Sequence, residues 1–133
     1  MRTIFVNGVF DLLHLGHLSL LRDARALGDC LHVAIDTDRR VRMLKGPNRP
    51  IRNQVERQSL LEELRCVDRV WTFDTDQELR DIIRDISPAV MVKGSDYRDR
   101  PIIGSEYCGS IKFIDMLHGH STTSTIERIA AGR

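Results

Sequence analysis

Residues 4–17 read Ile-Phe-Val-Asn-Gly-Val-Phe-Asp-Leu-Leu-His-Leu-Gly-His, and this stretch decides the fold class. It opens on a short apolar run of strand-forming residues. From His17 to Leu27 the apolar spacing is helical, and Gly28 follows as a stop signal. A strand that turns through glycine into a helix is the start of a βαβ unit, so the stretch predicts an α/β fold.

The same alternation continues along the chain. Four further apolar runs predict strands: Leu31 to Ile35, Val70 to Phe73, Ala89 to Val92 and Ile111 to Ile114. Helical spacing recurs from Asn53 to Arg65 and from Asp76 to Ile86. We therefore expect a single domain over residues 1–133, with a Rossmann-like, doubly wound, mainly parallel five-stranded sheet and helices on both faces.

Composition limits the class of protein and its partners. The 133 residues are 41% hydrophobic and 29% charged, which excludes wholesale disorder, and no apolar stretch is long enough to span a membrane. The net charge of +1 gives no overall attraction to nucleic acid or to a membrane. Three widely spaced cysteines and an N-terminus without signal-peptide features predict a cytoplasmic protein with reduced thiols.

Ligands of such sheets bind beyond the carboxyl ends of the strands. Four segments follow the predicted strands: Gly8 to His17, Asp36 to Pro50, Lys93 to Asp99 and His118 to Ser124. The candidate functional residues are expected in these segments.

Two histidines mark the first segment. His14 and His17 are three residues apart and so share one helix face, and Gly16 lets a ligand approach the backbone. Imidazole N–H groups at a helix N-terminus suit a phosphate group. The alternatives are two structural histidines or half of a metal site, but no third ligand is evident, so we expect no metal held by the protein.

Basic residues mark the second and third segments. The chain has three lysines against seventeen arginines, and two of the lysines, Lys45 and Lys93, directly precede a glycine in what the pattern predicts as loops. Asp36 to Arg52 is predicted as one long irregular segment, and its part from Arg39 to Arg52 carries six basic residues and no acid. A compact ammonium group suits a phosphate that moves during a reaction, whereas a solvated surface lysine is the alternative.

Five consecutive hydroxyl residues, Ser121 to Thr125, mark the fourth segment. Ser124 and Glu127 have the spacing of a capping box, which predicts a helix start there. The run is either redundant capping or an anion cradle of hydroxyl groups and helix amides, and we favour the cradle.

At these residues the sequence resembles the nucleotidyltransferase superfamily with the His-x-Gly-His signature, here residues 14–17, and within it the cytidylyltransferase-like group. The segments Leu44 to Ile51 and Val92 to Tyr97 are most similar to D-glycero-D-manno-heptose 1-phosphate adenylyltransferase domains. Glycerol-3-phosphate cytidylyltransferases are similar too, but Met116 and Leu117 replace the arginine and threonine usual in that group. Ser95 departs from the second glycine of the heptose group, so the acceptor stays open.

The resemblance implies an enzyme that joins a nucleoside triphosphate, ATP, to a sugar phosphate, heptose 1-phosphate, and releases pyrophosphate. The alternatives are a cytidylyltransferase that uses CTP and a polyol phosphate, and a nucleotide-binding module without catalysis. The resemblance also implies Mg²⁺ bound with the nucleotide, a homodimer, and a stand-alone transferase without a sugar-kinase domain.

The resemblance assigns roles to individual residues. His14, His17 and Lys45 are the expected catalytic residues, and Asp38 and Arg65 are expected to face the acceptor. The expected nucleotide-binding residues are Val9, Phe10, Asp11, Gly16, Lys93, Gly94, Asp96, Ser121, Thr122, Thr123 and Ser124.

Overall fold

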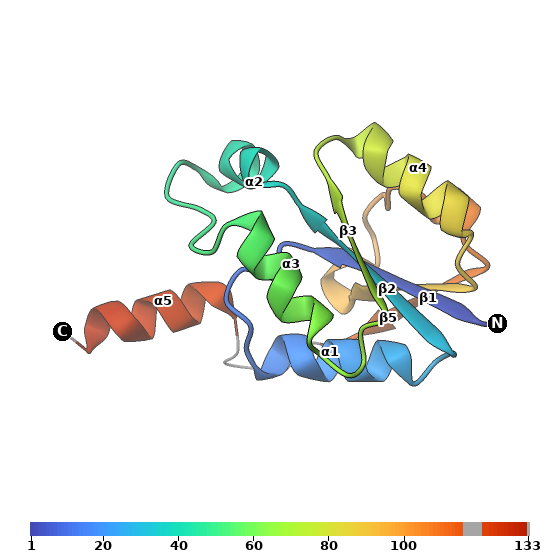
Figure 1. Ribbon diagram of the computed structural model, residues 1–133, viewed down its shortest axis with the longest axis horizontal. Coiled ribbons are helices and arrows are strands. Elements are labelled where there is room, and N and C mark those ends of the chain that lie inside the picture. Colours follow the sequence, from blue (N-terminus) through green and yellow to red (C-terminus); the bar gives the residue numbers. More distant parts are fainter. Residues whose placement is uncertain (116–120, 133) are drawn as a thin grey trace.

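The computed structural model describes residues 1–115 and 121–132, and its centre is one five-stranded sheet (Figure 1). The strands are β1 (Thr3–Gly8), β2 (Cys30–Asp36), β3 (Arg69–Phe73), β4 (Val90–Gly94) and β5 (Ser110–Ile114). Their order in the sheet is β3-β2-β1-β4-β5, and all four pairings are parallel. The chain winds outward from β1 to β3 and then crosses to β4 and β5, which confirms the doubly wound parallel sheet.

Helices cover both faces of the sheet, as predicted (Figure 1). The helices are α1 (Leu15–Arg25), α2 (Asp38–Lys45), α3 (Gln54–Glu62), α4 (Asp76–Ile86) and α5 (Thr122–Ala131), and two 3₁₀ turns are η1 (Ser95–Tyr97) and η2 (Ser105–Tyr107). α1 and α3 pack on one face and α4 packs on the other. None of the helices among the described residues is long and apolar enough to cross a membrane.

Two hydrophobic cores, one on each face, hold these layers together. Ile4 and Val6 of β1 pack with Leu21 and Leu61 under α1 and α3. Phe5, between them in sequence, points to the opposite face and packs with α4. Neighbouring strand residues alternate between faces, so a strand buried on both sides reads as an uninterrupted apolar run. This is why the strands were predictable from short apolar runs.

The segment from Asp36 to Arg52 is not one irregular loop, and that prediction is wrong. Residues 38–45 form α2, which begins where the Thr37 side chain accepts a hydrogen bond from the Arg40 amide and ends at Gly46 with φ of 100°. Val41 is the one buried residue of this helix, so its sequence carries no apolar period. Lys45 is therefore the last residue of a helix, and Lys93 lies within β4 rather than in a loop.

Helix ends also differ from the predictions. The capping box of α5 pairs Ser121 with Ser124, one turn earlier than the expected pair of Ser124 and Glu127. α1 begins at Leu15, which makes His14 its N-cap. Met116, Leu117 and the first three residues of the fourth candidate segment, His118 to His120, lie outside the described residues.

Candidate active site

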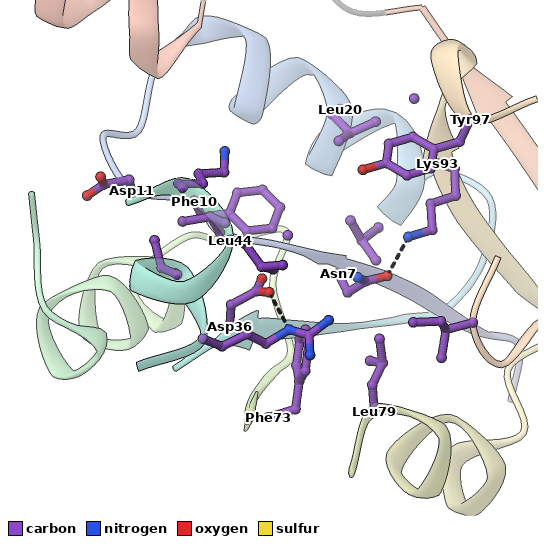
Figure 2. A pocket seen from close by; sticks show the side chains of 18 of the residues that line it. Asn7, Phe10, Asp11, Leu20, Asp36, Leu44, Phe73, Leu79, Lys93 and Tyr97 are labelled. Carbon is purple, nitrogen blue, oxygen red and sulfur yellow. Dashed lines mark hydrogen bonds and ion pairs between the residues drawn. The ribbon is translucent and has the colours of Figure 1, made fainter. Parts of the chain in front are cut away.

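A pocket of about 520 Å³ opens at the carboxyl ends of β1, β2 and β4 (Figure 2). Asn7, Asp36 and Lys93 enter it from these three strand ends. The strand order reverses between β1 and β4, and such a switch point is where open α/β sheets bind their ligands. The pocket therefore lies at the sheet edge that the sequence predicts.

A strained turn follows β1 and forms one wall of the pocket. Phe10 has φ of 51° in the left-handed region, although it is neither glycine nor asparagine, and its side chain is only 5% exposed. Its ring lies 5.1 Å from the ring of His17 and so close to Gly8 that an added Cβ there would be 3.0 Å from Phe10 Cε2. Packing on both sides holds Phe10 in this conformation.

His14 and His17 start α1 by capping each other. The Nδ1 atom of His14 accepts a hydrogen bond from the Gly16 amide at 3.1 Å, and the Nδ1 atom of His17 accepts one from the His14 amide at 3.3 Å. The two rings stack with centroids 3.8 Å apart. Because each Nδ1 is an acceptor, a neutral imidazole here carries its proton on Nε2. The capping box thus fixes the tautomer of both histidines.

The pKa of His17 supports the neutral form. Burial and, to a smaller extent, the neighbouring His14 lower this pKa, Asp11 partly opposes both, and the resulting pKa is about 4. His17 is therefore neutral at pH 7 and lines the pocket, whereas His14 stacks on it without lining the pocket. The start of α1 therefore presents neutral hydrogen-bond donors to an anion and does not present a positively charged imidazole.

Cationic and hydroxyl groups from three other segments join His17 at this end of the pocket. Lys45 at the end of α2, Arg49 in the following loop and Thr122 at the start of α5 all line it. Arg49 Nη2 lies 3.5 Å from the hydroxyl oxygen of Thr123, which brings the loop and α5 together. Ser121 and Ser124 bond each other in the α5 capping box. We call the set of His17, Lys45, Arg49 and Thr122 the phosphate end.

A partly buried lysine marks the opposite end of the pocket. Lys93 Nζ donates a hydrogen bond to Asn7 Oδ1 at 2.8 Å and lies 5.0 Å from the centre of the Tyr97 ring (Figure 2). Burial lowers the pKa of Lys93, and the Asp36 and Asp96 carboxylates oppose this effect. Val9, Gly94 and Asp96 also line the pocket, as expected. The ammonium group of Lys93 is thus held in place by contacts within the protein and does not extend into solvent.

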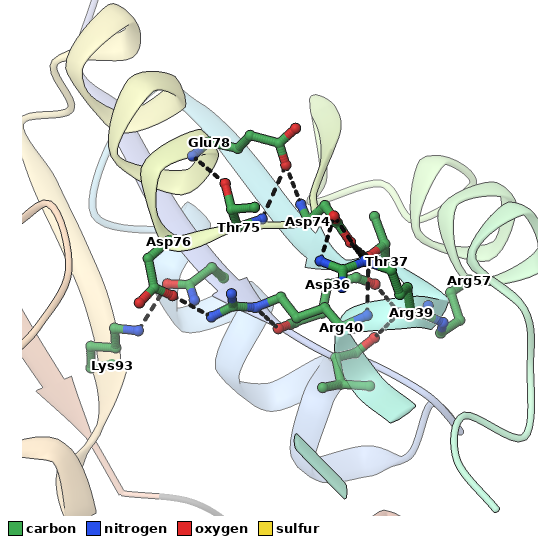
Figure 3. A network of polar contacts seen from close by, with 12 residues as sticks. Asp36, Thr37, Arg39, Arg40, Arg57, Asp74, Thr75, Asp76, Glu78 and Lys93 are labelled. Carbon is green, nitrogen blue, oxygen red and sulfur yellow. Dashed lines mark hydrogen bonds and ion pairs between the residues drawn. The ribbon is translucent and has the colours of Figure 1, made fainter. Parts of the chain in front are cut away.

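Ion pairs neutralise part of the positive charge of the six basic residues between Arg39 and Arg52 (Figure 3). Arg40 lines the pocket and bonds Asp36 at 2.9 Å and Asp76 at 2.8 Å, and Arg39 pairs with Asp74 at 2.7 Å. Arg39 holds the pKa of the Asp74 carboxyl below its ordinary value. The sequence did not predict these ion pairs, because Asp74 and Asp76 lie more than thirty positions away from Arg39 and Arg40.

Two predicted residues hold the protein together around the site. The Asp11 carboxylate is 3% exposed and accepts hydrogen bonds from the amides of Ile51 and Arg52, both at 2.8 Å. Asp38 is not a pocket-lining residue, and its carboxylate pairs with Arg57 at 2.8 Å. Both carboxylates are therefore engaged by the protein itself.

Arg65 is the predicted site residue that the structure separates most clearly from the pocket. It is exposed, follows the end of α3, and precedes the start of β3 at Arg69. It thus lies at the edge where the strands begin, opposite the pocket. Its position contradicts a role at the pocket of the same chain.

The sequence reasoning missed several residues of the site and its support. The missed lining residues include Asn7 and Arg40 and the apolar side chains of Leu44, Leu79, Ile102 and Ile103. The buried Arg57 beneath the site was also missed, although its spacing of four from Leu61 places it on the core-facing side of α3. That spacing is the one signal that could have found it.

The chain belongs to the cytidylyltransferase-like family, whose model matches residues 5–126. The family resemblance predicted from the sequence is thereby confirmed. Curated relatives include the bifunctional protein HldE of Campylobacter fetus, 44% identical over 95% of this chain and 27% of that protein. HldE of Helicobacter hepaticus is 44% identical over 96% of this chain and 26% of that protein. This chain thus spans about a quarter of the length of these relatives.

A solved structure agrees with the fold. The lipopolysaccharide core biosynthesis protein from Thermoplasma volcanium aligns with a TM-score of 0.69 and 27% identity, and the alignment covers 88% of this chain and 97% of that one. This likeness confirms the α/β fold class expected from the sequence.

Proposed function

We propose that this chain is a nucleotidyltransferase that joins ATP to heptose 1-phosphate and releases pyrophosphate. Membership of the cytidylyltransferase-like family supports the reaction class. The similarity to HldE proteins, and the resemblance of Leu44 to Ile51 and of Val92 to Tyr97 to heptose 1-phosphate adenylyltransferases, support the substrates. The observation that carries the proposal is the phosphate end, where His17, Lys45 and Thr122 converge from α1, α2 and α5.

The reaction is a displacement at phosphorus. A phosphate oxygen of the acceptor bonds to the α-phosphorus of the triphosphate, and the bond from the α-phosphorus to the bridging oxygen breaks, so that pyrophosphate leaves with that electron pair. No covalent enzyme intermediate is needed, so the protein contributes positioning and charge stabilisation.

Three groups of the phosphate end have a defined part in this step. The neutral imidazole of His17 donates its Nε2 proton in a hydrogen bond to the phosphoryl oxygens, and the capped start of α1 adds its partial positive charge. Lys45 bridges the phosphates of the two substrates as a compact cation. Thr122 and the hydroxyl groups beside it bind the β- and γ-phosphates.

The nucleoside binds toward the other end. Val9 and Phe10 supply the wall after β1, and Lys93, Gly94 and Asp96, at the end of β4 and just after it, supply the floor. The Asn7 hydrogen bond fixes Lys93, so its charge is directed at a constant position.

Mg²⁺ is proposed to arrive with the triphosphate. The donors at the phosphate end are imidazole, ammonium, guanidinium and hydroxyl groups, which suit phosphate oxygens and fit a metal ion carried by the nucleotide. Among the described residues no group of three or more His, Cys, Asp or Glu side chains is placed to hold a metal ion. When bound, the ion would neutralise part of the charge on the departing pyrophosphate.

A screen of pyrophosphate release tests the proposal. ATP, CTP, GTP and UTP are each paired with heptose 1-phosphate, glycerol 3-phosphate and ribitol 5-phosphate. We expect turnover with ATP and heptose 1-phosphate. Turnover with CTP alone would replace the adenylyl assignment, and tight nucleotide binding without release in any pairing would indicate a binding module.

The homodimer and the cytoplasmic location stay predictions. Light scattering on the eluting protein tests the dimer, and fractionation of cells tests the location. A monomer across the concentrations used in the assay would contradict the first.

A further inference from the structure

Arg57 of α3 is the most deeply buried charged side chain of the described residues. It is 1% exposed, and it does not line the pocket. A buried guanidinium group is costly unless its N–H groups find partners in fixed geometry. Its partners are therefore informative about why an arginine stands here.

Four hydrogen bonds join Arg57 to four different segments around the site. Its Nη1 atom donates to the carbonyl oxygen of Val9 at 3.0 Å and to that of Asp36 at 2.8 Å. Its Nε atom donates to the carbonyl oxygen of Arg52 at 3.0 Å, and its Nη2 atom pairs with Asp38 Oδ1 at 2.8 Å. These acceptors lie after β1, at the end of β2, before α3 and at the start of α2 (Figure 3 shows Arg57 beside the network of α2).

A second set of hydrogen bonds, from Asp11, meets those of Arg57 at Arg52. The Asp11 carboxylate holds the amide of Arg52, while Arg57 holds its carbonyl oxygen. Both the amide and the carbonyl group of Arg52 are thus hydrogen-bonded, which fixes the backbone of the loop at this residue. Arg57 also fixes the start of α2 through Asp38. Lys45 and the loop after it therefore lie between two positions that Arg57 holds, Asp38 and Arg52.

The geometry points to Arg57 as a positioning residue that sets the spacing between His17 and the phosphate-binding end of α2. It holds the carbonyl of Val9, beside the strained Phe10 that packs on His17, and the first residue of the helix that carries Lys45. The role rests on the proposed transferase function but not on any contact between Arg57 and substrate.

Lysine cannot replace arginine in this role. An ammonium group donates from a single point, whereas these four acceptors surround a planar fork. In Arg57→Lys we expect the amides of Ile51 and Arg52 to exchange faster and kcat/KM for both substrates to fall by about 10²-fold, since a displacement of about 1 Å costs that much. Asp38→Asn removes one partner, so the same changes should follow in smaller measure.

The experiment compares wild type, Arg57→Lys, Asp38→Asn and the control Arg84→Met, an exposed arginine of α4 whose ion pairs within the described residues are with Asp81 and Asp85 of its own helix. Thermal unfolding, hydrogen exchange without ligand and steady-state pyrophosphate release are measured on each. The control should match wild type in all three.

Lower thermal stability of Arg57→Lys with unchanged exchange at Ile51 and Arg52 and unchanged kcat/KM would overturn the proposal, because Arg57 would then only support the fold. If Arg57→Lys does not fold, Asp38→Asn decides by the same measurements. If wild type releases no pyrophosphate in any pairing, the proposed function fails, and the exchange rates alone decide the role of Arg57.

Discussion

At the scale of single residues, His14 and His17 both have a structural role at the start of α1, and His17 is in addition the proposed donor to the phosphoryl oxygens. Their Nδ1 atoms cap α1, and this leaves Nε2 as the proton-bearing atom of each neutral ring. The sequence predicted the shared helix face and the phosphate chemistry from the spacing. It could not predict the mutual capping, because which nitrogen accepts depends on backbone angles at His14.

Asparagine separates the two roles of the histidines. It is a good N-cap and accepts through Oδ1, but it has no donor in the place of Nε2. We expect His14→Asn to keep the thermal stability and to lose kcat, and His17→Ala to lose kcat by about 10²–10³-fold with little change in KM. Steady-state kinetics and thermal unfolding measure both. A chelator that unfolds the protein would instead favour a metal site.

Lys45 tests whether charge or geometry matters at the phosphate end. Lys45→Ala should damage kcat/KM for both substrates, because one cation serves both. Lys45→Arg keeps the charge on a wide planar group, so substrate binding should recover in part and turnover should not. The matched control is Arg42→Lys, on the same helix but not lining the pocket. Full activity of Lys45→Arg would exclude the bridging role.

At the scale of elements, helices with a buried stripe were predictable and α2 was not. The predicted bounds of α4, Asp76 to Ile86, agree with the structure because Leu79 and Ile83 repeat at helical spacing behind an acidic first turn. α2 is held by the Thr37 cap and by ion pairs of Arg39 and Arg40 to residues after β3. Such long-range pairing leaves no periodic signal in the sequence.

The end of α2 depends on Gly46. Its φ of 100° and ψ of 172° fall in a region that is essentially limited to glycine, while a Cβ there would have no atom within 4 Å. Gly46→Ala should therefore cost about 1–3 kcal/mol through backbone strain alone, or else shift the end of α2 and with it Lys45. Urea unfolding and kcat/KM measure the two effects. Unchanged stability together with unchanged activity would contradict the need for glycine.

At the scale of the whole molecule, the topology brings distant segments to one pocket. The order β3-β2-β1-β4-β5 places the ends of β1, β2 and β4 side by side, and α5 returns Thr122 to the same end. The rule for parallel sheets predicted this edge from the sequence. It could not show how a carboxylate is used: Asp11 lines the pocket but also accepts the loop amides of Ile51 and Arg52, and Asp38 pairs with Arg57 without lining the pocket.

Stability should fall in acid because His17 is partly buried in the neutral form. Its pKa is about 4 in the folded chain and about 6.5 when unfolded, so between these values the unfolded chain binds more protons. Above about pH 6.5 the contribution of His17 to the free energy of unfolding does not change with pH. As the pH falls from 6.5 toward 4, this contribution lowers the free energy of unfolding. Acidic groups in ion pairs add their own dependence at lower pH, so the comparison must be with a variant. His17→Asn keeps a neutral side chain that can accept the His14 amide and removes this titration. Urea unfolding at several pH values from 7 to 4 should give a steeper decline for wild type than for His17→Asn. Parallel curves would show that His17 titrates alike in both states, and the neutral donor assigned to it would lose its basis.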